Sequence, residues 1–147
     1  MNKIIKVSNI SLLLFSSLYM LAACDKERAN LGLRIAVISK DITRVKQCLD
    51  YGADRDTANS YGFTPLLIAA RDNSYQIVAL LLAEKATIDF QGNSKTTAVH
   101  MATRYDSLEV VQLLIKAQAN MDLKDSFGKT ALDYAKEKEV MVLLSQE

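Results

Sequence analysis

One short segment of this chain recurs at a fixed interval of 33 residues, and this feature limits the possible folds more than any other. The segment reads TPLLIAA from Thr64, TAVHMAT from Thr97 and TALDYAK from Thr130, and a weaker copy, LGLRIAV, starts at Leu31. Similar residues form columns through all four copies: Ala36, Ala69, Ala102 and Ala135; Leu33, Leu66, Val99 and Leu132; Ile35, Ile68, Met101 and Tyr134. Such a period predicts a solenoid of stacked units, and these columns are expected to form its core.

Each unit is expected to contain two helices. Thr64 is a good N-cap, and Pro65, the only proline, loses no hydrogen bond at the first helical position. The sequence therefore predicts a short first helix, roughly Thr64 to Arg71. Apolar residues at helical spacing predict a second helix, roughly Tyr75 to Ala83.

Two helices and a turn in 33 residues, with the T-P-L-x-x-A-A segment, resemble the ankyrin repeat. The resemblance covers residues 30–147 and implies an all-α solenoid of four units, about 30–56, 57–89, 90–122 and 123–147, with short β-turn fingers. Terminal units face water on one side, so both ends of the solenoid are expected to carry altered, more polar surfaces.

Several positions depart from the ankyrin pattern. Lys85 and Gln118 replace the glycine that usually follows the second helix, which predicts strained or differently closed helix ends. Lys95 replaces a turn glycine, for which the nearby Gly92 is expected to compensate. The fourth unit lacks about three residues between its helices, and the first unit lacks the Thr-Pro start.

The first 23 residues have the layout of a cleaved signal peptide: Lys3 and Lys6, an apolar region from Ile10 to Leu21, then two alanines. A transmembrane anchor is the alternative, although serines and an asparagine interrupt the apolar stretch. Leu21-Ala22-Ala23-Cys24 resembles the lipobox of bacterial lipoproteins. The resemblance implies diacylation of Cys24, a lipidated tether over residues 24–29, and a sorting role for Asp25 that retains the protein on the periplasmic face of the inner membrane.

The composition argues against catalysis and nucleic-acid binding. Without Lys3 and Lys6 the 18 basic residues fall to 16, against 17 acidic residues, so no polyanion-binding field is expected. His100 is the only histidine and stands where ankyrin units often use one for structural hydrogen bonds. With Cys48 as the only cysteine besides Cys24, no His/Cys metal cluster can be assembled, and we expect no cofactor and no enzyme.

The resemblance implies that another protein binds to the turn tips and to the exposed side of the first helices. Aromatic and arginine side chains are the usual interface anchors, and an arginine can bind a partner's carboxylates. The candidate partner-binding residues are Tyr61, Phe63, Arg71, Asp72, Arg104, Tyr105, Phe127 and Lys129. Aromatics packed between adjacent turns and merely solvated arginines are the plainer interpretation of the same positions.

These observations lead to a monomeric, protein-binding lipoprotein of the bacterial envelope. Small ankyrin lipoproteins resemble immunity proteins that block toxic effectors such as phospholipases in the periplasm. The alternative is a periplasmic scaffold that supports a resident envelope enzyme. A third interpretation, an effector released into a host cell, conflicts with the lipobox.

Overall fold

The first helix of the second unit, α3 (Pro65–Arg71), begins as its sequence predicts: Thr64 has extended backbone angles and its hydroxyl accepts the amide of Leu67. The computed structural model describes residues 25–136, 141, 142 and 144. Residues 25–38 are helical, and α2 (Ile42–Asp50), α4 (Tyr75–Ala83), α5 (Ala98–Arg104), α6 (Leu108–Lys116) and the 3-10 turn η1 (Leu132–Tyr134) follow. Within these residues there is no strand, so the all-α prediction is confirmed.

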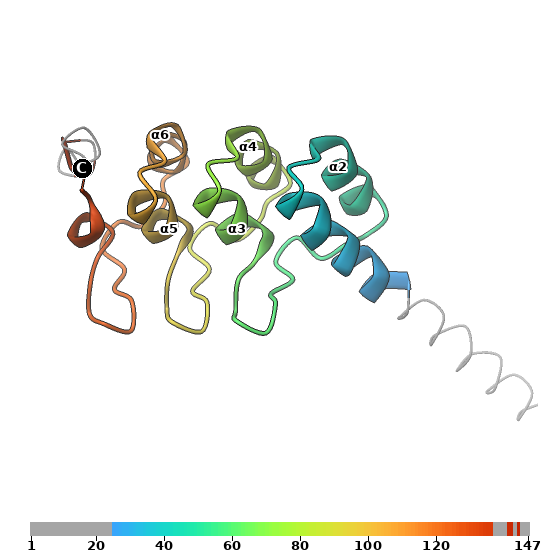
Figure 1. Ribbon diagram of the computed structural model, residues 1–147, viewed down its shortest axis with the longest axis horizontal. Helices are drawn as coiled ribbons and strands as arrows, with labels where there is room; N and C mark the ends of the chain where they lie inside the picture. The colour runs from blue at the N-terminus through green and yellow to red at the C-terminus, as the bar shows by residue number, and fades with distance from the viewer. Residues whose placement is uncertain (1–24, 137–140, 143, 145–147) are drawn as a thin grey trace, which may run out of the picture.

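The units stack side by side in one row, and the first helices form one layer while the second helices form another (Figure 1). Helix α3 packs against α4 and α5, and α6 packs against α4 and α5. The loops between units project together from one side as fingers (Figure 1). The predicted solenoid is therefore confirmed.

The repeated columns form the core where two neighbours enclose them. Ala36, Ala69 and Ala102 are fully buried, and so are Leu33 and Leu66. The last unit departs from this pattern: Leu132 is 41% exposed, and only the single turn η1 stands where the sequence predicts a full first helix. In the described residues, no further unit lies beyond η1 to cover that leucine.

Each described α-helix before η1 is followed by a residue in the left-handed backbone conformation. Lys40, Asn73 and Asp106, which follow the first helices, have φ values of +57°, +50° and +54°. Lys85 and Gln118 follow second helices and have φ values of +65° and +61°. The missing glycines therefore do not change the closure, and two long side chains occupy left-handed positions instead.

The prediction for Gly92 was wrong. Lys95 itself takes the left-handed conformation, with φ of +54°, and Gly92 has another role. A Cβ on Gly92 would lie 2.6 Å from the carbonyl oxygen of Gly62, so the glycine permits close contact between neighbouring fingers.

The N-terminal end also differs from expectation. Leu31, Ile35 and Ile38 are 51%, 49% and 59% exposed, so the outer surface of the first unit is apolar where a more polar one was predicted. Residues 25–29, predicted as a tether, continue the first helix, while the signal peptide 1–23 and Cys24 lie outside the described residues. Of the helices described, none is long and apolar enough to cross a membrane.

Candidate functional site

The fingers present two aromatic side chains to solvent. Tyr61 is 73% exposed and Phe127 is 78% exposed. Asn59 holds the finger of the second unit by accepting the amides of Tyr61 and Phe63, each at 3.0 Å. Asp125 does the same in the fourth unit, and the amides of Phe127 and Lys129 donate to its carboxylate at 2.8 and 3.0 Å. Fixed backbones therefore hold both aromatic tips away from the core.

Phe63 does not belong to this exposed set. It is half-buried and packs against the core, directly before the buried cap residue Thr64. The expectation that Phe63 is solvent-exposed was therefore wrong, while its role as a partner-binding residue stays a prediction.

Arg71 and Asp72 bind each other. The guanidinium donates twice to the carboxylate, Nε to Oδ1 at 2.7 Å and Nη2 to Oδ2 at 3.1 Å. This hydrogen bonding to Asp72 raises the pKa of Arg71 above its ordinary value, and the phenol of Tyr105 adds a smaller electrostatic contribution. The pair is neutral as a unit, so Arg71 does not offer the free cation expected for a partner's carboxylate.

Arg104 and Lys129 converge on one aromatic ring. The guanidinium carbon of Arg104 lies 5.4 Å from the ring centroid of Tyr134, and Nζ of Lys129 lies 5.2 Å from it. These distances are within the range of cation–π attraction. Among the described residues the one ion pair joins Arg71 to Asp72, so neither of these two cations has a carboxylate partner there.

Tyr134 is held in place by Asp125. Its hydroxyl donates to Oδ2 at 2.5 Å, and His100 meets the ring edge-on with centroids 6.2 Å apart. This hydrogen bond raises the pKa of Tyr134. Desolvation raises the pKa of Asp125, but the bonds from Tyr134 and from two backbone amides outweigh it and leave that pKa below its usual value. We call Arg104, Asp125, Lys129 and Tyr134 the Tyr134 cluster.

Sequence reasoning missed Tyr134, which it assigned to a core column. In that column Ile68 and Met101 are buried, whereas Tyr134 is half-buried and carries the only hydroxyl. A polar aromatic residue in an otherwise aliphatic column was the available signal.

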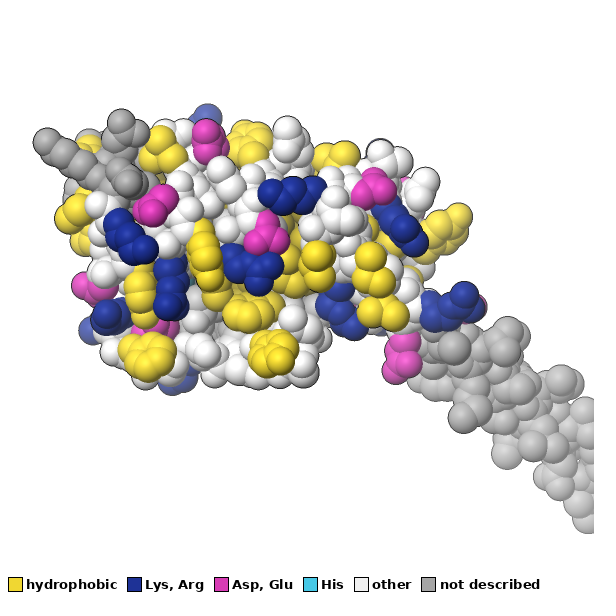
Figure 2. Space-filling view, in the orientation of Figure 1, with side chains coloured by type: hydrophobic (Ala, Val, Ile, Leu, Met, Phe, Trp, Pro, Cys, Tyr) yellow, Lys and Arg dark blue, Asp and Glu magenta, His cyan; other side chains and the backbone are white. Residues whose placement is uncertain are grey.

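Tyr105 is the remaining candidate, and it directly follows α5. Tyr105 is 55% exposed, and its phenol acts on the pKa of Arg71 in the preceding unit. Hydrophobic and basic side chains intermix over the first helices and along the fingers on the face shown in Figure 2. The candidate residues thus form two groups: the neutral Arg71–Asp72 pair near Tyr105, and the Tyr134 cluster, which shares a finger with Phe127.

His100 has a structural role. Its Nδ1 accepts from the Thr97 amide at 3.4 Å and lies 2.8 Å from the Thr97 hydroxyl, while Nε2 lies 3.1 Å from the carbonyl oxygen of Lys129. The ring is 2% exposed, and a neutral imidazole protonated at Nε2 satisfies both contacts. Cys48 is a half-buried free thiol. Over the described residues, no three His, Cys, Asp or Glu side chains gather in a way that could hold a metal ion.

Comparison with known proteins agrees with this architecture. A family model described as ankyrin repeats matches in three overlapping copies, over residues 10–92, 33–125 and 79–146. The chain is 36% identical over 87 residues to protein fem-1 homolog A of Rattus norvegicus, a match that covers 59% of this chain and 13% of that protein. It is 33% identical over 73 residues to the "Ankyrin repeat, SAM and basic leucine zipper domain-containing protein 1" of Atelerix albiventris, covering 50% of this chain and 15% of that protein. The chain therefore spans only about one seventh of these relatives' length.

Proposed function

Because the chain belongs to the ankyrin repeat family, whose repeats generally mediate protein–protein interaction, we propose that it binds another protein through its fingers and first helices. The observation that carries this proposal is the Tyr134 cluster. It presents two cations on an aromatic platform, and neither of them forms an ion pair with a described carboxylate. Arg104 and Lys129 can bind a carboxylate of the partner through charge-assisted hydrogen bonds. Arginine and aromatic side chains are also among the residues that contribute most to binding at protein interfaces.

The exposed aromatics extend the proposed surface. Tyr105 follows Arg104 directly in the chain, and Phe127 stands at the tip of the finger that also carries Lys129. An acidic group beside apolar side chains on the partner would match this arrangement. The neutral Arg71–Asp72 pair would contribute shape and hydrogen bonds, with little net charge.

We further propose that the protein acts in the bacterial envelope as an immunity protein that binds and inhibits a toxic effector, such as a phospholipase. The support lies in the sequence: a leader with positive, apolar and small-residue regions that ends in the lipobox-like Leu21-Ala22-Ala23-Cys24. Lipidation of Cys24 and the sorting role of Asp25 would hold the protein on the periplasmic face of the inner membrane. No catalytic activity and no cofactor are part of this proposal.

The test is crosslinked capture of partners from membranes that contain the full-length protein, before and after contact with rival cells. Recovery of a lipase or another toxin, chiefly after contact, supports an immunity role. Recovery of the same resident enzyme under both conditions would replace it with the scaffold alternative.

Site variants separate the binding surface from the identity of the partner. Capture should fall by about tenfold or more when Arg104, Tyr105 and Phe127 are all changed to alanine, since anchor residues typically contribute more than 1 kcal/mol each. The matched control changes Arg44 and Tyr51, both exposed and both on or directly after α2, to alanine. Equal capture by the site variant and the control variant would refute the proposed surface.

A further inference from the structure

The N-terminal helix has two apolar faces. Leu33, Ala36 and Val37 are fully buried against the solenoid. At about 100° per residue, Leu31, Ile35 and Ile38 fall together on the opposite side, where each is about half exposed. A surface helix of a soluble domain normally carries polar residues there.

One residue of this face lies on the stacking surface of the solenoid: Ile35 belongs to the same column as Ile68 and Met101, which are 4% and 7% exposed inside the stack. Ile38 lies beside it, in the column of Arg71 and Arg104. No described residue precedes the first unit to cover Ile35. Three apolar side chains gathered on one exposed helix face form a candidate interaction surface.

The sequence directly before the helix indicates what that is. Residues 25–38 follow Cys24 directly, and only three residues lie between Asp25 and the apolar region from Ile10 to Leu21. If Cys24 is acylated, the chain meets lipid at that residue; if the leader is kept as an anchor, it leaves the bilayer there as well. Both interpretations of the leader place the start of the helix at a membrane surface.

We propose that the outer face of this helix, Leu31, Ile35 and Ile38, lies in the lipid surface and fixes the orientation of the solenoid on the membrane. This inference rests on the membrane attachment proposed above, but it does not depend on any protein partner. The two acyl chains of a diacylated Cys24 would already hold the protein at the bilayer, but at a single point that leaves the orientation of the solenoid free. The helix face supplies a second contact, which fixes that orientation.

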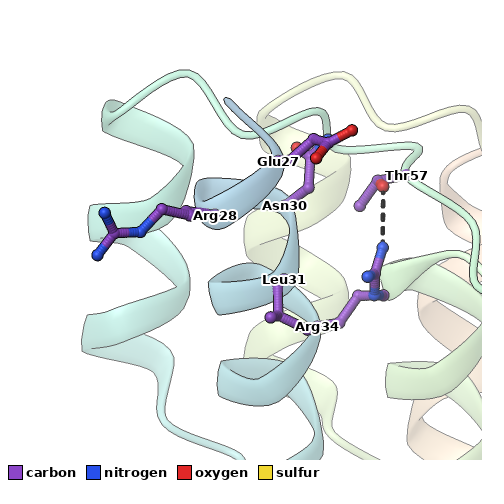
Figure 3. A pocket seen from close by; sticks show the side chains of 6 residues that line it. All are labelled: Glu27, Arg28, Asn30, Leu31, Arg34 and Thr57. Carbon is purple, nitrogen blue, oxygen red and sulfur yellow. Dashed lines mark hydrogen bonds between the residues drawn. The ribbon is translucent and has the colours of Figure 1, made fainter. Parts of the chain in front are cut away.

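The first turns of the helix carry charges of both signs: Asp25 and Glu27 are exposed there as well as two cations. Lys26 and Arg28 are exposed in the first turns of the helix, and Figure 3 shows that Arg28 points away from the other side chains of the shallow hollow beside Leu31. That hollow, about 480 Å³, is lined on its other side by Arg34, whose guanidinium donates to the Thr57 hydroxyl at 3.2 Å. Because the four charged residues of the first turns balance in charge, the proposed docking depends on the apolar side chains and not on attraction to anionic headgroups.

The experiment places a fluorescent reporter on the proposed lipid face. The full-length protein, with Cys48→Ala, receives a single reporter cysteine through Ile38→Cys or, as a control, through Tyr51→Cys; Tyr51 is 84% exposed at the end of α2. Each protein is labelled with an environment-sensitive dye and reconstituted into vesicles of phosphatidylethanolamine and phosphatidylglycerol. A sample without a reporter cysteine measures any labelling of Cys24.

The dye at position 38 should shift its emission to the blue and be quenched by spin-labelled lipid, while the dye at position 51 should report water. Adding Leu31→Ser and Ile35→Ser should lower the ratio of docked to undocked protein by about thirtyfold and return the emission at position 38 toward that of water. Circular dichroism of this variant should match the parent, because both changed side chains are about half exposed.

Three results would overturn the inference. Emission typical of water at position 38, in protein that sediments with the vesicles, would show attachment without docking. Protein that does not sediment with the vesicles would remove the membrane attachment itself. Lipid-independent protection at position 38 that rises with protein concentration would assign the face to a second copy of the chain. None of these results bears on the Tyr134 cluster, which the capture experiment tests separately.

Discussion

The three second helices that precede a finger end in the same motif, although only one of them has the glycine that fits it. Gly52, Lys85 and Gln118 have φ values of +83°, +65° and +61°. The amide of each bonds to the carbonyl three residues back, at 2.9, 3.0 and 2.9 Å, and the following alanine amide bonds to the carbonyl five residues back, at 2.9, 2.9 and 3.0 Å. These are the two bonds of the Schellman motif, whose central position favours glycine.

Replacing the two strained residues should therefore stabilise the protein. A left-handed conformation costs a non-glycine residue about 1–2 kcal/mol, and glycine returns about 0.4–1 kcal/mol of this through the greater entropy of the unfolded chain. The net gain is about 0.5–1 kcal/mol for Lys85→Gly and the same for Gln118→Gly. The two positions lie in different units, so their effects should add to about 1–2 kcal/mol in the double variant.

Urea denaturation followed by circular dichroism measures this gain, which corresponds to a rise of about 0.5–1 M in the transition midpoint. The converse change, Gly52→Ala, should lower the free energy of unfolding by about 1 kcal/mol. No atom lies within 4 Å of the added Cβ, so this loss isolates the backbone strain. A double glycine variant no more stable than the parent, together with a neutral Gly52→Ala, would refute the assignment of strain to these positions.

Three further predictions concern the fingers and the caps. Asp125→Ala should cost about 2 kcal/mol through the lost bonds to its carboxylate, whereas Asp125→Asn should cost less. The folded-state pKa of Asp125 is lowered, so its stabilising charge is fully present above the unfolded value of about 3.9. The urea midpoints of parent and Asp125→Asn should therefore differ by a constant amount near neutral pH and draw together only as the pH falls below about 3.9. Gly92→Ala should cost about 1–3 kcal/mol in the same assay, because its Cβ would meet the Gly62 carbonyl oxygen at 2.6 Å. Ser107→Ala should change stability by less than about 0.5 kcal/mol, since this buried hydroxyl has no hydrogen-bond partner in the described structure.

Local rules and repetition were enough to predict the backbone. The second helix expected from Tyr75 to Ala83 has those bounds in the structure, and Thr64 caps the first helix as its hydroxyl and the following proline suggest. Because the units repeat every 33 residues, a helix identified in one unit predicts the same helix in the next unit, even where the sequence of that unit indicates it only weakly. This extrapolation between units fails only where a neighbour is missing, as at Leu132 and Ile35.

The side-chain pairing at the candidate site could not be predicted in the same way. Adjacent residues on a helix point in different directions, so Arg71 and Asp72 were not expected to pair. Asp72 is the C-cap, however, and its departure from helical geometry lets its carboxylate meet the guanidinium. Likewise, the contact of Arg104 and Lys129 with Tyr134 depends on how two units stack, which no single segment encodes.

The two proposals place different contacts at opposite ends of the solenoid. The apolar face of the N-terminal helix lies at one end of the row of units, and η1, which carries Tyr134, lies at the other (Figure 1). Between them stands the Arg71–Asp72 pair, which carries no net charge. A protein attached to lipid through its first unit would thus keep Arg104 and Lys129 in the units farthest from the attachment point, where a soluble acidic partner can reach them. Because no described side chain belongs to both surfaces, changes to Leu31 and Ile35 should leave partner capture unaltered, and changes to Arg104 should leave membrane docking unaltered.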